Sequence, residues 1–349
     1  MKPAVYITRS AAALPNAPVE NDAVEAILGQ VGERPSRARR VVQRNNGIRR
    51  RYYAVDPATG EPSHSNARLT AQAIRGLAGN GFALEDIACL ACGTSNADQL
   101  LPNHAVMVHG ELGSPACEVV ATAGVCLSGT TALKYGWMSV LSGCSRNAVV
   151  TGSEVASKVL RAKNYDQAEL TFEEDFLRWM LSDGAGALLL EPAPRRGLNL
   201  RIEWLELLSY ANQLPTCMSM GADQRLRQDV RLLNEAVVDY TLVKPLQRVV
   251  AKRSLSADKV DWFLPHMSSE YFRRPVADGL ARAGLPVPQE RWFTNLVSVG
   301  NIGAAAIYLM LDELLRSGRI RAGQRLLCFV PESGRFSSGF MYLTAHAHA

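Results

Sequence analysis

The chain has 349 residues, 47% of them hydrophobic and 20% charged, with a formal net charge of +5 at pH 7. This composition predicts a soluble globular protein of one large or two medium domains. No apolar run approaches the roughly 18 residues of a membrane span, and no signal peptide is recognisable at the start, so we expect a cytoplasmic protein. Seven scattered cysteines, an odd number, indicate reduced thiols and give no basis for proposing a disulfide framework.

Short β-type runs alternate with helical patterns along the chain, which predicts a layered α/β architecture. A Pro- and Gly-containing break at 192–197, after which the alternation restarts, suggests two similar halves, residues 1–192 and 193–349. The expected strands are 4–8, 86–92, 148–151, 185–190, 262–264 and 325–329. The expected helices are 66–78, 101–112, 130–141, 232–250 and 304–316.

Cys89 and Cys92 form a C-x-x-C pair, a spacing that is also used by metal and redox sites. Both lie in a strand-like run, where an offset of three residues directs two side chains to opposite faces. The sequence has no second pair of this kind. We therefore predict that both thiols pack in the core and bind no metal.

A run of small residues, 121–130, places Cys126 just before a helical stretch. At a helix N-terminus, free amide N–H groups and the helix dipole favour a thiolate over a thiol. His266 ends the apolar run 260–265, and Asn301 precedes another helix. A thiol, an imidazole and an amide are thus expected at the ends of elements, as acyl transfer through a thioester requires.

Eight arginines and no acidic residue lie between positions 34 and 51. Such a segment favours the docking of phosphates or of an acidic carrier protein. A solvated face with some internal ion pairs is the alternative interpretation. Nucleic acid is not an expected partner, because no nucleic-acid-binding motif accompanies the arginines. The residues are Arg34, Arg37, Arg39, Arg40, Arg44, Arg49, Arg50 and Arg51.

Four segments in this order resemble the β-ketoacyl synthase III-like enzymes of the thiolase fold, and the resemblance runs nearly end to end. They are 46–51, the helix start at Cys126, 181–190 and 297–324. The resemblance implies a five-layer α-β-α-β-α fold of two related halves, usually in a homodimer. It implies no metal and no cofactor, since the substrates are carried on the phosphopantetheine of acyl carrier protein or coenzyme A.

The family's Cys-His-Asn set, reached by a pantetheine tunnel, maps onto Cys126, His266 and Asn301. Cys126 would hold an acyl group as a thioester. His266 and Asn301 would then donate hydrogen bonds to the carbonyl oxygen of the second substrate as it becomes an enolate. Arg40, Arg44 and Arg49 are expected to bind the carrier or its phosphopantetheine at the tunnel mouth.

Three departures from the family pattern suggest secondary metabolism in place of the first step of fatty acid synthesis. The segment 331–340 lacks the usual glycine-rich run, so the main-chain N–H of Ser337 is expected to join that of Cys126 as an oxyanion donor. Ser269 stands where the family usually has an asparagine, and it would have to take over any orienting role of that amide. No aromatic residue precedes Gly47 to stack on an adenine, which favours carrier-bound acyl groups over coenzyme A.

The segment 172–183 looks like the ketosynthase-like enzymes of dialkylresorcinol and stilbene pathways, which close a 2,5-dialkylcyclohexane-1,3-dione ring. Glu154 follows a strand end and could supply the additional acid or base for such a step, although a purely structural role for this acidic residue is the favoured interpretation. A Claisen condensation that releases a linear β-keto product, in fatty acid or polyketide biosynthesis, is the leading expectation. Two further alternatives stay open: acyl transfer to an oxygen or nitrogen acceptor, and a non-catalytic partner subunit of a heterodimer.

Overall fold

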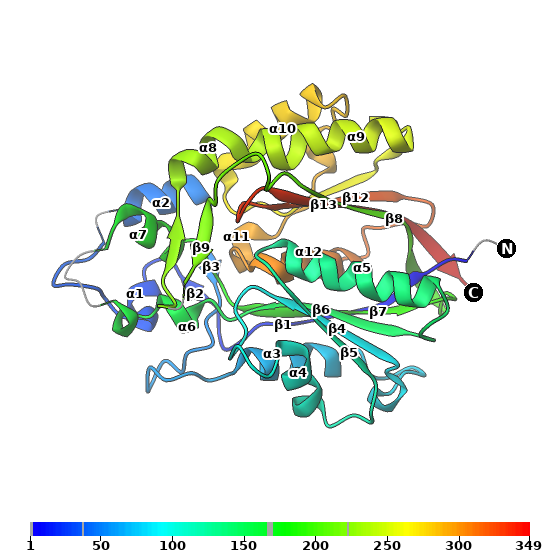
Figure 1. Ribbon diagram of the computed structural model, residues 1–349, viewed down its shortest axis with the longest axis horizontal. Helices are drawn as coiled ribbons and strands as arrows, with labels where there is room; N and C mark the ends of the chain where they lie inside the picture. Colours follow the sequence, from blue (N-terminus) through cyan, green and yellow to red (C-terminus); the bar gives the residue numbers. More distant parts are fainter. Residues whose placement is uncertain (1–2, 37, 166–169, 222) are drawn as a thin grey trace.

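The structure is a computed structural model that describes residues 3–36, 38–165, 170–221 and 223–349. Nine strands are hydrogen-bonded in the order β11-β12-β13-β8-β1-β7-β6-β4-β5. The strands of the first half of the chain lie in one layer and those of the second half in another, with helices α5 and α12 between them (Figure 1). The first layer contains β1 (Tyr6–Ala13), β4 (Cys89–Thr94), β5 (Glu118–Ala123), β6 (Ala148–Glu154) and β7 (Gly184–Glu191). The second contains β8 (Gly197–Ser209), β11 (Trp262–Pro265), β12 (Arg325–Glu332) and β13 (Ser337–His348).

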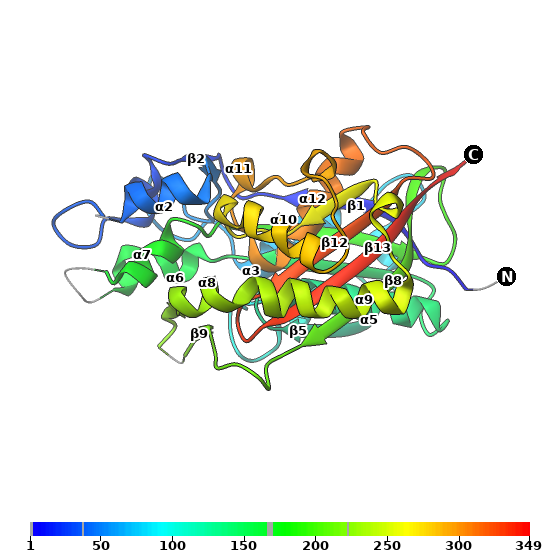
Figure 2. The same cartoon turned by 90° about the horizontal axis from the view of Figure 1, so that it is seen from above.

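Helices cover both outer faces of the two sheet layers. α3 (Asn66–Arg75) and α4 (His104–Leu112) pack on the first layer, while α8 (Val230–Val238), α9 (Lys244–Arg253) and α10 (Arg273–Arg282) pack on the second (Figures 1 and 2). The central helices are α5 (Leu127–Leu141) and α12 (Ala306–Arg316). The five-layer α-β-α-β-α arrangement expected from the sequence is confirmed.

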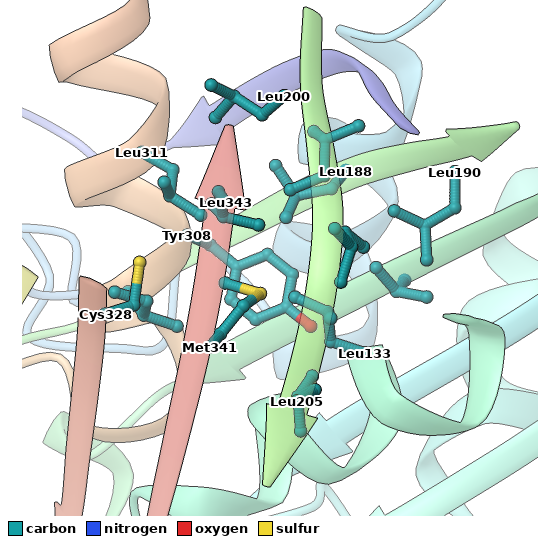
Figure 3. Packing of buried hydrophobic residues seen from close by; sticks show 14 of the residues in the cluster. Leu133, Leu188, Leu190, Leu200, Leu205, Tyr308, Leu311, Cys328, Met341 and Leu343 are labelled. Atoms are coloured by element: carbon teal, nitrogen blue, oxygen red, sulfur yellow. The ribbon is translucent and has the colours of Figure 1, made fainter. Parts of the chain in front are cut away.

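Strand alternation explains why the central helical layer is buried on both sides. In β7, Leu188 and Leu190 point to the central layer while Leu189 points to the α3–α4 layer. In β12, Cys328 faces the centre while Phe329 faces α8 and α10. Because side chains alternate along a strand, each apolar strand contributes to two cores at once. Figure 3 shows Leu133 of α5 and Tyr308 of α12 in the central cluster.

The shorter elements lie at one end of the sheets (Figures 1 and 2). They include two small antiparallel sheets of two strands each, β2 with β3 and β9 with β10. Their bounds are β2 (Val19–Glu20), β3 (Arg50–Arg51), β9 (Met218–Met220) and β10 (Leu226–Gln228). The short helices are α1 (Val24–Leu28), α2 (Arg39–Asn46), α6 (Ser157–Leu160), α7 (Phe172–Arg178) and α11 (Leu296–Val299).

The expectation of one continuous helix over 232–250 is wrong in one respect. A π-helical segment, Asp239–Val243, separates α8 from α9. Gly279 of α10 packs against it, and a Cβ there would lie 2.8 Å from a side-chain carbon of Val238.

Of the C-x-x-C pair, Cys89 faces the central layer and Cys92 faces α3 and α4, as predicted. Among the helices of the described residues, none is long and apolar enough to cross a membrane.

Candidate active site

Cys126 is the residue directly before α5, in the turn that follows the edge strand β5. Side chains fix this turn from within: Thr122 Oγ1 donates to the carbonyl of Ser128 at 2.8 Å, and Ser128 Oγ donates to the carbonyl of Val125 at 2.8 Å. The small residues expected to form a helix start therefore do so. They hold Cys126 at the surface of an internal cavity.

The loop that carries Asn301 packs against α5 and β6 through a close approach of main chains. A Cβ on Gly129 of α5 would lie 2.3 Å from the carbonyl oxygen of Ala304, and a Cβ on Gly152 of β6 would lie 2.2 Å from the same oxygen. Glycine is required at both positions because no side chain fits there. Tyr308 Oη also donates to the carbonyl of Gly129 at 2.7 Å.

The side-chain amide of Asn301 already uses its oxygen in a hydrogen bond within the same loop. Its Oδ1 accepts the main-chain N–H of Gly303 at 3.0 Å, and its own main chain exchanges hydrogen bonds with Met180 and Ser182 at 3.1 and 2.9 Å. With Oδ1 used in this way, the Nδ2 group is the end that can donate to a bound carbonyl.

His266 follows β11, and its main-chain N–H donates to Phe329 of β12 at 2.8 Å. Its side chain lines a narrow cavity of about 50 Å³ that Cys126 also lines. Burial lowers the pKa of His266 to about 4. The imidazole is therefore neutral near pH 7, and a neutral imidazole has one N–H donor.

A larger cavity of about 360 Å³ brings together residues from both halves of the chain. Cys126, Glu154 and Asn301 all line it. Its apolar wall comes from α7, the segment after it, and the β9–β10 hairpin, through Leu177, Met180, Leu181, Met218, Met220 and Leu226. The narrow cavity beside His266 shares Cys126, Leu233, Ser268 and Ser333 with it.

The electrostatic surroundings of Cys126 differ from the sequence-based expectation. Glu332 at the end of β12 accepts the N–H groups of Val125 and Leu127 through one carboxylate oxygen, at 3.0 Å each. Burial, then the carboxylates of Glu332 and Glu154, raise the pKa of Cys126 well above its usual range. The expected stabilisation of a thiolate is therefore corrected, because a carboxylate occupies the amides on either side of the thiol.

Glu154 reaches the cavity at the end of β6. It accepts hydrogen bonds from Ser95 Oγ at 2.5 Å and from the main-chain N–H groups of Ser95 and Ala304 at 3.2 and 3.1 Å. Burial raises the pKa of Glu154 to about 7, against these three hydrogen bonds, which lower it. A carboxyl group with that pKa exchanges protons near neutral pH.

Two of the auxiliary residues lie away from the cavities. Ser337 is the first residue of β13, where its Oγ donates to Ser209 Oγ at 3.1 Å, and the residue of this hairpin that lines both cavities is Ser333. Ser269 Oγ donates to the carbonyl of Asn45 at 3.2 Å and accepts the N–H of Tyr271, so it joins the loop after His266 to α2. Sequence reasoning missed Ser333 and Glu332, whose only local signal is a polar pair after an apolar strand.

The arginine segment divides into buried and exposed members. Arg51 is fully buried and donates to the carbonyl of Trp179 and to Asn21 Oδ1, so it does not belong to a surface patch. Arg50 pairs with Glu20 at 2.7 Å, and Arg39 approaches Glu25 at 3.8 Å. Arg37 lies outside the described residues. The exposed members are Arg34, Arg40, Arg44, Arg49 and the ion-paired Arg50.

The chain is similar to known proteins along most of its length. A family model for the C-terminal part of 3-oxoacyl-[acyl-carrier-protein (ACP)] synthase III matches residues 250–342. The β-ketoacyl-[acyl-carrier-protein] synthase III of Rhizorhabdus wittichii is 28% identical over 306 residues, which are 86% of this chain and 88% of that protein. The protein of the same description from Sphingopyxis alaskensis is 28% identical over 336 residues, 94% of each chain.

A solved structure, that of the tetronic acid condensing enzyme AbyA1, matches the fold with a TM-score of 0.83 at 22% identity. The match covers 97% of this chain and 99% of AbyA1. The chain thus has the thiolase fold. Over most of its length it is similar to β-ketoacyl-[acyl-carrier-protein] synthase III proteins.

Proposed function

We propose that the protein forms an acyl-Cys126 thioester and condenses it with a malonyl- or β-ketoacyl thioester carried on acyl carrier protein or coenzyme A. The observation that carries this proposal is the cavity lined by both Cys126 and Asn301, which meets the cavity of His266 at Cys126. Carbon–carbon bond formation suits these residues because an amide cannot act as the base that an alcohol or amine acceptor needs.

In the first step, the Sγ of Cys126 attacks the carbonyl carbon of an acyl thioester. The new carbon–sulfur bond replaces the bond to the pantetheine sulfur, and the proton of Cys126 leaves on the pantetheine thiol. The step is therefore balanced without any net uptake of protons. The main-chain N–H of Cys126, which lies between the two amides bound by Glu332, would donate to the oxyanion.

In the second step, a malonyl thioester loses carbon dioxide, or a β-ketoacyl thioester transfers an α-proton to the carboxylate of Glu154, and either reaction gives an enolate. His266 and the Nδ2 of Asn301 would donate hydrogen bonds to the enolate oxygen. A neutral imidazole with a low pKa fits this task because it donates a hydrogen bond without transferring its proton. The enolate carbon then attacks the acyl carbonyl, and the Cys126 thiolate leaves and takes up a proton.

The lining of the larger cavity supports an aliphatic acyl group as the primer. Its volume of about 360 Å³ falls within the usual range for small-molecule sites, and leucine and methionine side chains form much of its wall. Methionine adapts to several chain shapes, so the β9–β10 hairpin would contribute to chain-length selection through Met218 and Met220.

Arg40, Arg44 and Arg49 would receive an acidic carrier protein in the cytoplasm. Arg40 and Arg44 are exposed on α2, and Arg49 is exposed directly before β3. Ser269 links α2 to the loop that begins at His266. A carrier held on α2 would therefore lie close to the elements of the catalytic site. The same departures from the family pattern that favour a carrier also favour a role in secondary metabolism.

We also propose a homodimer, in which the free edge of β5 pairs with a second copy. β5 ends the sheet order, so one side of Glu118–Ala123 has main-chain groups available for pairing. Leu100 and Leu101, in the loop before α4, are 95% and 86% exposed. Large apolar side chains exposed to this degree favour burial in an interface.

A ketosynthase-cyclase that forms a 2,5-dialkylcyclohexane-1,3-dione is the second candidate, favoured by Glu154. This carboxyl lines the cavity beside Cys126, and its pKa of about 7 suits it to remove or return a proton during ring closure. On this proposal Glu154→Gln would release a linear product where the wild type releases a ring. A change in rate with no change in the product would exclude the cyclase role.

Intact-protein mass spectrometry after incubation with a panel of acyl-CoA and acyl-carrier thioesters tests the main proposal. The wild type should gain the mass of one acyl group, mapped to Cys126, and Cys126→Ala should gain none. The exposed Cys144 provides the matched control, since Cys144→Ala should be acylated as the wild type is. An acyl group mapped to a residue other than Cys126 would overturn the proposal.

A further inference from the structure

Glu332 holds the nucleophile turn by a pair of hydrogen bonds. Its Oε2 accepts the main-chain N–H groups of Val125 and Leu127, both at 3.0 Å, so one oxygen spans Cys126 on either side. The turn is packed tightly here. A Cβ on Gly124 would lie 3.3 Å from this oxygen, and a Cβ on Gly334 would lie 2.9 Å from the side chain of Val125.

This contact places a carboxylate on the two amides that flank Cys126 in the chain. Unpaired amides at the start of a helix stabilise an anion, but here the first helical amide, that of Leu127, and the amide of Val125 in the preceding turn are already bound to a carboxylate. A second negative charge within a few ångströms is disfavoured in a partly desolvated site. The charge of Glu332 and the thiolate of Cys126 therefore compete for the same amides.

We propose that Glu332 is a positioning residue for the nucleophile and that its charge keeps Cys126 a neutral thiol until an acyl thioester is bound. The proposal rests on the proposed role of Cys126 as the nucleophile. Thioester exchange is compatible with a neutral resting thiol because the proton of Cys126 ends on the departing pantetheine thiol. A neutral thiol also reacts slowly with oxidants and alkylating agents, so the site is protected while empty.

Three titratable groups bear on the thiol from the elements around it. Glu332 comes from β12 and Glu154 from the end of β6, and both raise the pKa of Cys126, after the larger contribution of burial. His266, from the segment after β11, lines the same narrow cavity and is neutral near pH 7 because burial lowers its pKa to about 4. Glu332 is the larger of the two charge contributions and the one bound to the nucleophile turn.

The test is the pH dependence of alkylation of Cys126 by iodoacetamide, followed by peptide mass spectrometry in the full-length protein. Glu332→Gln keeps a side-chain oxygen that can accept both amide hydrogen bonds but removes the charge. In Glu332→Gln, we expect the midpoint of the pH profile of Cys126 alkylation to lie about one pH unit or more below that of the wild type. At pH values below the midpoint, alkylation should then be about 10-fold faster than in the wild type. Cys144 in the same molecule is the internal reference, and its profile should not move. Glu235→Gln, on the exposed face of α8, is the matched control substitution.

A purely structural role for Glu332 predicts that Glu332→Gln and the wild type share one alkylation profile, and that result would overturn the proposal. If Glu332→Gln does not fold, the wild type alone decides. Its Cys126 should titrate clearly above the value of about 8.5 for a free cysteine, and a midpoint at or below that value would equally reject the proposal. Because alkylation needs no acyl donor, the result stands even if no thioester acylates Cys126. Failure of the acylation test would thus be distinguishable from failure of this one.

Discussion

The carbonyl oxygen of Ala304 lies against Gly152 so closely that a Cβ on this glycine would be 2.2 Å away from it. This contact joins β6, which ends at Glu154, to the loop that begins at Asn301. The separation between Glu154 and Asn301 is thus fixed by a contact of main chains. Rotation of side chains cannot change this separation.

Gly152→Ala should therefore disturb both stability and the site. The methyl group must displace the 301–305 loop or β6, and overpacking of this kind costs about 1–3 kcal/mol. Urea denaturation should show the loss, and the condensation rate should fall as Asn301 moves. Gly110→Ala is the matched control: nothing lies within 4 Å of its Cβ position in α4, so the change should leave the rate alone and stabilise the helix slightly. A Gly152 variant as stable as the wild type would contradict the proposed close approach.

The two hydrogen-bond donors should be separable from the nucleophile. His266→Ala and Asn301→Ala should each slow condensation by about 100-fold, the scale for loss of one oxyanion donor. Both variants should still take up an acyl group on Cys126, because the donors act on the second substrate. Rapid-quench assays with separate acylation and condensation readouts would measure the two steps. Condensation at the wild-type rate in the Asn301 variant would remove the amide from the mechanism.

Glu154 makes the stability of the fold depend on pH. Its pKa is raised to about 7 in the folded protein, from a usual value of 4.5, so the folded state binds this proton more tightly than the unfolded state does. The resulting stabilisation is fully present below about pH 4.5 and is lost as the pH rises through 7. Relative to Glu154→Gln, the wild type should therefore lose stability between pH 5 and pH 8.

Urea midpoints of the wild type and Glu154→Gln at several pH values would measure that difference. Asp183, whose pKa is raised to about 6 by burial, contributes in the same direction in both proteins and cancels in the comparison. A stability difference that stays constant from pH 5 to pH 8 would show that Glu154 is ionised in the folded protein throughout this range.

The exposed arginines should matter only when a carrier protein is present. Arg40→Glu and Arg44→Glu should raise the apparent KM for carrier-bound substrate but not for its N-acetylcysteamine analogue, which has neither the carrier surface nor the phosphate. The effect should fade as ionic strength rises, since exposed charges are screened. Arg321→Glu, an exposed arginine in the turn before β12, is the control. If the apparent KM rose equally for both substrates, the arginines of α2 would act on the fold or the catalytic pocket and not on carrier docking.

Local sequence patterns were sufficient for much of the core and, together with the family resemblance, for proposing three site residues. The apolar runs that became β6, β7, β11 and β12 each show an uninterrupted burial signal, because they are covered on both faces. His266 directly follows one of these strands, β11, while Cys126 and Asn301 stand in runs of small and apolar residues just before a helix. A pattern of this kind is written within ten residues, so it can be recognised without knowledge of the fold.

Other elements were missed because their local signal is weak. β5 is an edge strand with mostly half-buried residues, so no clear alternation marks it. β13 follows a polar hairpin and ends in exposed residues, and it owes its length to pairing with β8 and β12. Arg51 looked like its exposed neighbours in the sequence. Only the fold shows that the guanidinium of Arg51 is buried and donates to the carbonyl of Trp179, which is 128 residues away in the chain.

The sequence by itself supplied the thiol, the imidazole and the amide to which we assign the proposed chemistry, since side-chain identity is read directly from the sequence. Tertiary structure alone decided the electrostatic surroundings of Cys126. The start of a helix favours a thiolate when its amides are free, but Glu332 is 207 residues from Val125 in the chain, and the folded β12–β13 hairpin brings its carboxylate to those amides. Electrostatic interactions depend on distance in space, which no local pattern around Cys126 encodes.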